Sequence, residues 1–170
     1  MSAEQTIFGQ ADAVALTIAG ALNAASAAGS FCLPLKARWL QEREIDVKVL
    51  PKIGEPVDVQ IFPMHDQADR TALMNFYDDL YGVNILIQQV VGGQVKTQIP
   101  ILSLLRSQVF EWLMSQPLTT TNAVHNVKGI HVNAVRPSKE GLYWIERLHQ
   151  EGAFYSDNTV TFKAPGLRRQ

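Results

Sequence analysis

Apolar and polar positions recur at regular spacing along most of this chain, and the spacing predicts where helices and strands form. The Ala-rich segment 11–27 has helical periodicity, with a larger side chain every three or four residues. These larger residues are Val14, Ile18, Leu22 and Ala25. They predict a first helix with one bulky face, while the small residues elsewhere allow a neighbouring backbone to approach closely.

Strand patterns follow this helix. Residues 31–40 predict a strand, and Pro34 within it suits an edge position because proline cannot donate a hydrogen bond to a second neighbour. Residues 41–56 are ambiguous. Val47 and Val49 alternate with charged residues as in a strand, but prolines and a glycine then interrupt the segment.

The middle of the chain carries the clearest strands. Apolar and polar residues alternate strictly over 57–61, which predicts a half-buried strand, and Pro63 is predicted to end it. Residues 64–75 are polar at first and lack a strand pattern, so we interpret them as a long excursion. The longest strand is predicted over 76–91, where a Gly-Gly turn closes it.

The second half of the chain predicts four further elements. A helix is expected over 100–116, because its apolar residues recur at helical spacing between two prolines. A strand of mixed pattern follows over 124–135, then a short helix near 142–148, and a last strand over 154–163. The apolar stripe of the long helix consists of Leu102, Leu105, Val109, Trp112 and Leu113, and we expect it to form core.

This order of elements predicts the fold class. Runs of strands between only two long helices indicate α+β, not a repeating βαβ arrangement. We expect a single domain over 1–163, with a mixed or antiparallel sheet of about four to five strands packed by two main helices plus a short C-terminal helix. Residues 164–170 are predicted to form a C-terminal tail that is flexible or ordered by a partner.

Composition narrows the function. The chain has 170 residues, 46% of them hydrophobic and 18% charged, so it can bury a core yet has fewer charges than the ~25% of an average soluble domain. Its net charge of −1 argues against a protein that coats nucleic acid, which needs a basic excess. So much uncharged surface suggests that part of it is covered, for instance by other copies of the chain.

Segment 11–33 is the only candidate for membrane insertion, and its composition argues against that role. Ala, Gly and Ser dominate it, and these residues gain little on transfer into lipid. A secretory signal requires basic residues near its start, but the first eleven residues contain no Lys or Arg. We therefore expect a non-secreted protein with no membrane partner.

A search for chemistry finds no catalytic, phosphate-binding or metal-binding motif. His65, Asp66 and Asp69 are clustered, but a solvated loop explains them better than a metal site. Cys32 lies between Phe31 and Leu33, so we expect a buried and inert thiol. We predict no catalytic residue, no metal and no cofactor.

One alternative from a different class stays open, namely a small α+β ligand-binding or enzyme domain. Such a domain needs a pocket with convergent polar groups. Its candidate residues are His125, His131, Trp144 and Cys32. His125 and His131 alone cannot chelate one metal, because six residues of strand separate them by roughly 20 Å.

Several segments, taken together, follow an order of elements that is typical of one protein family. An N-terminal helix leads to a strand with an aromatic near its end, an acidic-hydrophobic stretch, a strand ending in proline, a polar excursion with Arg70, and a long strand. The segments are KARWL (36–40), EIDVKVL (44–50), VDVQIFP (57–63), YGVNILIQ (81–88) and, after Leu148, FYS (154–156). This layout, which covers most of residues 10–163, resembles the tail terminator, or neck (tail completion), proteins of tailed bacteriophages.

The resemblance implies a structural virion protein without an active site. It implies a subunit of a hexameric, head-to-tail ring that caps the tail tube, ends its polymerisation and joins the tail to the head connector. The implied partners are other copies of the chain, the tail tube protein and head-tail connector or neck proteins, with genomic DNA only passing through the lumen. The implied location is the head-tail junction of the virion, and the host cytoplasm during assembly. Another neck or head-completion subunit is the nearest alternative.

If the resemblance holds, the polar excursion and the C-terminal tail are the expected contact segments. The candidate interface residues are His65, Asp66, Asp69, Arg70, Leu167, Arg168 and Arg169.

Overall fold

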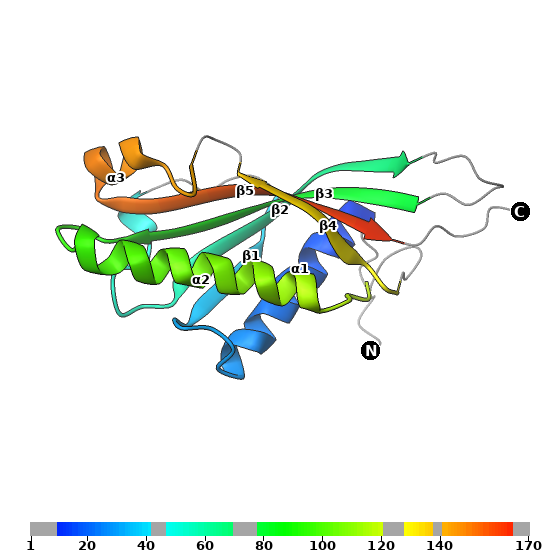
Figure 1. Ribbon diagram of the computed structural model, residues 1–170, viewed down its shortest axis with the longest axis horizontal. Helices are drawn as coiled ribbons and strands as arrows, with labels where there is room; N and C mark the ends of the chain where they lie inside the picture. Colours follow the sequence, from blue (N-terminus) through cyan, green and yellow to red (C-terminus); the bar gives the residue numbers. More distant parts are fainter. Residues whose placement is uncertain (1–9, 42–46, 70–77, 121–127, 138–140, 165–170) are drawn as a thin grey trace, which may run out of the picture.

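A computed structural model describes residues 10–41, 47–69, 78–120, 128–137 and 141–164. Its elements follow the predicted order of a helix, a run of strands, a helix, a strand, a short helix and a strand, with a 3₁₀ turn within the run (Figure 1). They are α1 (Gln10–Ala27), β1 (Leu35–Trp39), the 3₁₀ helix η1 (Val47–Val49), β2 (Val57–Asp69), β3 (Asp78–Val90), α2 (Val95–Ser115), β4 (His131–Pro137), α3 (Ile145–Glu151) and β5 (Ala153–Ala164).

The five strands form one sheet in the order β1-β2-β3-β5-β4. β1 runs parallel to β2, and all the other neighbours are antiparallel. The two long helices lie on the same side of this sheet (Figure 1). The predicted fold class, a mixed sheet with two main helices and a short C-terminal helix in one α+β domain, is confirmed.

The core lies between the sheet and the two long helices. Alternate residues of each strand point to this side, and most of them are apolar, with Ser156 and Asn158 of β5 as polar exceptions. The helices contribute the stripes predicted from their spacing. The fully buried members include Ile18, Leu22, Val59, Ile61, Ile85, Ile87, Leu102, Leu105 and Leu113.

The opposite face of the sheet carries polar side chains beside a small apolar cluster of Phe62, Leu86 and Tyr155, and it is largely buried. Asp58, Gln60, Asn84, Gln88 and Asp157 each have at most 7% of their surface exposed. The alternation over 57–61 predicts a strand that is buried on one face only. The structure shows that its polar face is buried as well, which the pattern did not predict.

β2 does not end at Pro63, which corrects one sequence prediction. The strand continues to Asp69 and pairs with β3 down to Asp69↔Asp78, so residues 64–69 are strand rather than loop. The register shifts between Pro63 and His65. β1 pairs with β2 only as far as Trp39↔Ile61, so Pro63 has a single strand neighbour and its missing N–H costs no ladder bond.

One further prediction near the N-terminus was wrong, and one segment left ambiguous is now assigned. The strand expected over 31–40 is only five residues long, because residues 31–34 form a connection in which Phe31 packs edge-on against Trp112. The edge position inferred from Pro34 is confirmed, since β1 ends the sheet. Val47 and Val49, whose alternation suggested a strand, belong to the 3₁₀ helix η1.

In the second half, two boundaries move. α2 begins at Val95, one and a half turns before Pro100, which therefore sits inside the helix. Pro100 and Lys96 are both exposed, so water can reach the carbonyl that the proline leaves unbonded. The strand expected over 124–135 is β4, which begins at His131. Residues 121–127 lie outside the described residues.

Candidate functional site

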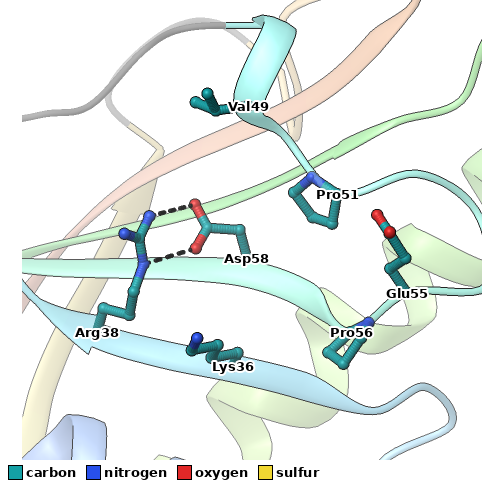
Figure 2. A pocket seen from close by; sticks show the side chains of 7 residues that line it. All are labelled: Lys36, Arg38, Val49, Pro51, Glu55, Pro56 and Asp58. Atoms are coloured by element: carbon teal, nitrogen blue, oxygen red, sulfur yellow. Dashed lines mark hydrogen bonds and ion pairs between the residues drawn. The ribbon is translucent and has the colours of Figure 1, made fainter.

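A cavity of about 490 Å³ opens on the polar face of the sheet, beside the edge strand β1 (Figure 2). β1 and β2 form its floor, and the segment from η1 to the start of β2 forms its wall. The lining residues are Lys36, Arg38, Val49, Pro51, Glu55, Pro56 and Asp58. It lies within the range of volumes that hold small ligands, about 300–1,000 Å³.

An ion pair occupies one side of this cavity. Arg38 donates from Nε to Oδ1 of Asp58 at 3.0 Å and from Nη2 to Oδ2 at 3.1 Å (Figure 2). Oδ2 also accepts from Nε2 of Gln60 at 3.0 Å and from Nε2 of Gln88 at 2.8 Å. Oδ2 therefore accepts three bonds and Oδ1 one, so most of the acceptor capacity of the carboxylate is used. Asp58 is thus a structural hub that ties three strands together and is poorly placed to act as a base.

The rest of the cavity offers charge without a nucleophile. Lys36 has no hydrogen-bond or ion-pair partner in the described part of the chain, and its side chain borders the cavity. Glu55 accepts a hydrogen bond from the backbone N–H of Lys52 at 2.7 Å. The lining therefore holds two cations and two anions, and no His, Cys or Ser. Such a recess can receive a polar group, but its residues are not those of a reaction centre.

The other end of the polar face is covered by α3. Trp144 packs on Tyr155 with ring centroids 4.6 Å apart, and the guanidinium of Arg147 lies 4.5 Å from the Tyr155 ring centroid. Arg147 also pairs with Glu151 at 2.6 Å, one helical turn on. In the middle of the face, Nδ2 of Asn84 donates to Oδ1 of Asp157 at 2.6 Å. The contacts of Trp144 and Arg147 with Tyr155 pack α3 and the residue before it onto the sheet.

The candidate interface residues fall into two groups. His65, Asp66 and Asp69 lie on β2 beyond the register shift, so they belong to a strand and not to the expected loop. Arg70, Leu167, Arg168 and Arg169 lie outside the described residues. β5 extends to Ala164, so only residues 165–170 of the predicted tail follow the last strand.

Cys32 is exposed, which corrects the prediction of a buried thiol. Its apolar neighbours belong to a connection rather than a strand, so they do not place the sulfur in the core. The Sγ lies 3.7 Å from the carbonyl oxygen of Ile101, and partial desolvation at this contact raises the pKa of the thiol. A raised pKa lowers the thiolate fraction at neutral pH, which disfavours a role as a nucleophile.

The described candidate residues of the ligand-binding or enzyme alternative do not lie together at one site. Cys32 contacts α2, whereas Trp144 packs on the opposite, polar face of the sheet. His131 is exposed at the start of β4, with Nδ1 3.2 Å from the carbonyl oxygen of Gly129, and His125 lies outside the described residues. Within the described ranges, no group of three or more His, Cys, Asp or Glu residues could hold a metal ion.

Sequence reasoning missed the hub at Asp58 and its partners. The available signal was the pair Asn84 and Gln88, two polar residues inside the most apolar stretch of the chain. Polar side chains there need partners when they are buried, and such partners stand on the neighbouring strands.

Comparison with known proteins gives no relative. No protein-family model matches the sequence, and no curated protein is similar to it. Among the described helices, none combines the length and apolar character needed to cross a membrane.

Proposed function

We propose that this chain is a structural subunit of a ring at the head-tail junction of a tailed bacteriophage. The ring caps the tail tube, ends its polymerisation and presents a surface to the head connector. The family layout described above supports this role, and the observation that carries the proposal is the shape of the β2–β3 hairpin.

The β2–β3 hairpin continues beyond β1, while β5 accompanies β3 as far as Asp79↔Ala164. β2 loses β1 as a neighbour after Ile61 but stays paired with β3 as far as Asp69. The two strands run together past the end of α2 (Figure 1). Residues 62–69 therefore have β3 on one side and no described strand on the other. An open strand edge is a ready element for contact with a neighbouring subunit.

The outer surface of α2 exposes large apolar side chains, as surfaces that contact another protein often do. Leu104 and Met114 expose 52% and 57% of their surface, and Ile101 is also exposed on the same helix. Large apolar residues on one exposed helix favour contact with another protein. In the proposed ring, unlike surfaces of adjacent copies meet, and such heterologous contacts close when the rotation between copies divides a full turn.

Tube growth in the presence of the chain tests this function. Tail tube subunits are polymerised with and without the purified full-length protein, and the products are imaged by negative-stain electron microscopy. We expect rings at one end of shortened tubes, in proportion to the protein added. Tubes of unchanged length with bare ends, at a molar excess of the protein, would contradict the proposal.

A further inference from the structure

A second recess lies between α2 and the edge strand β4. Its volume is about 470 Å³. From α2 it is lined by two adjacent stripes of the helix, Arg106, Phe110 and Met114 in one and Ser107 and Glu111 in the other. From β4 it is lined by the four consecutive residues 132–135.

The β4 side of this recess is a strand edge. Side chains alternate between the two faces of a sheet, so four consecutive residues can border one cavity only where the cavity runs along the backbone edge. β4 pairs with β5 on one side and with no described strand on the other. The recess is therefore a groove whose floor offers backbone hydrogen-bonding groups to an added strand.

Arg106 places a cation in the groove, which Glu111 also lines, and no described carboxylate forms an ion pair with it. Its Nε and Nη2 donate to Oδ1 of Asn158 at 3.2 and 2.7 Å, and its guanidinium lies 5.0 Å from the Phe110 ring centroid. Nδ2 of Asn158 donates to Oγ of Ser156, which fixes the amide. A guanidinium has five N–H donors, so three are left over, and no carboxylate of the described residues reaches them.

The chain itself carries a segment that fits this groove. The open edge of β2 and the open edge of β4 lie on opposite sides of the sheet. β2 is antiparallel to β3, and β3 and β4 are both antiparallel to β5. A neighbouring copy in the same orientation would therefore bring its β2 antiparallel to β4, the geometry in which strands pair most stably.

The register aligns an acidic residue with Arg106. Across one sheet, Asp66 pairs with Tyr81, Tyr81 with Phe162, and Phe162 with Val132. A copy placed side by side without a shift along the strands would bring its Asp66 level with Val132, which borders the groove that Arg106 lines.

We propose that the β2 edge of one subunit adds to the β4 edge of the next, and that Asp66 pairs with Arg106 across this contact. The inference rests on the proposed ring and specifies its subunit contact. The register shifts on both strands disfavour indiscriminate edge pairing. The charge pair then selects the partner edge, as electrostatic complementarity does at other interfaces.

Charge exchange tests the contact in the full-length chain. Arg106→Glu and Asp66→Arg are each expected to raise the concentration at which the protein assembles by about tenfold or more, as measured by mass photometry. Lys96→Glu makes the same charge reversal on an exposed part of α2 outside the groove, and it is expected to assemble like the wild type. Far-UV circular dichroism checks that each variant is folded.

Mixing the two variants gives the sharpest outcome. In an alternating ring of Arg106→Glu and Asp66→Arg copies, every contact again joins opposite charges, so an equimolar mixture is expected to assemble although neither variant does alone. If Arg106→Glu assembles like Lys96→Glu, or if the mixture stays as defective as its components, the proposed contact is wrong while the ring stands. If the wild type itself never assembles, the ring is wrong as well.

Discussion

Removing the carboxylate of Asp58 is expected to destabilise the protein more than any exposed charge on the same cavity. In Asp58→Ala, the donors of Arg38, Gln60 and Gln88 each lose a partner in one step. The variant therefore tests whether the buried polar face stabilises the fold.

The magnitude follows from the burial of each donor. The Arg38 side chain is 34% exposed, so water can hydrate it once its partner is removed. Breaking this ion pair therefore costs about as much stability as breaking a surface pair, up to about 1 kcal/mol. Gln60 and Gln88 are 1% and 0% exposed and cannot reach water. Each donor left unsatisfied there costs about 1–3 kcal/mol, less where the amide retains another bond. We expect a total loss of about 2–4 kcal/mol in the free energy of unfolding.

Equilibrium urea unfolding followed by tryptophan fluorescence measures this loss, at one fixed protein concentration because assembly would add to the apparent stability. Glu55→Ala is the matched control. It removes an exposed carboxylate from the same cavity and is expected to cost less than about 1 kcal/mol. If Asp58→Ala costs no more than Glu55→Ala, the hub does not stabilise the fold and the reasoning is refuted.

Three further predictions concern single positions. Leu105→Ala leaves a cavity under α2, where the side chain is fully buried, and should lower the free energy of unfolding by about 2–5 kcal/mol in the same urea assay; a loss below 1 kcal/mol would place Leu105 outside the core. Gly152 caps α3 at φ 62°, so Gly152→Ala should cost about 1 kcal/mol by thermal unfolding, whereas Gly20→Ala within α1 should stabilise slightly, and equal effects would contradict this difference. Cys32 should react completely with a thiol reagent in the folded protein but more slowly than free cysteine at pH 7, with a rate that rises with pH as the thiolate forms; a faster reaction than free cysteine would contradict the raised pKa.

The apolar periodicity predicted most of the fold because one face of nearly every element is buried against the same core. The alternation over 57–61 and the helical spacing in α1 and α2 each identify that face correctly. Pro63 misled the prediction, since a proline ends a strand only where both edges need donors, and which edge is open depends on the distant strand β1.

The candidate site was harder to predict than the fold. The polar positions of β2 alternate as in a solvated strand, and only the tertiary arrangement buries Asp58 beneath Arg38 and the cavity wall. Cys32 shows the reverse error, because apolar neighbours bury a residue only within a regular element. Arg106 gave no sequence signal, since its place in the groove depends on the edge position of β4.

The mass of the purified protein in solution tests the central proposal most directly. Size-exclusion chromatography with light scattering, over a range of concentrations, measures it without a partner protein. A six-fold ring of the 18.9 kDa chain predicts a single species of about 113 kDa. A mass that stays at that of one chain at every concentration, and also after mixing with tail tube subunits, would contradict a ring-forming subunit.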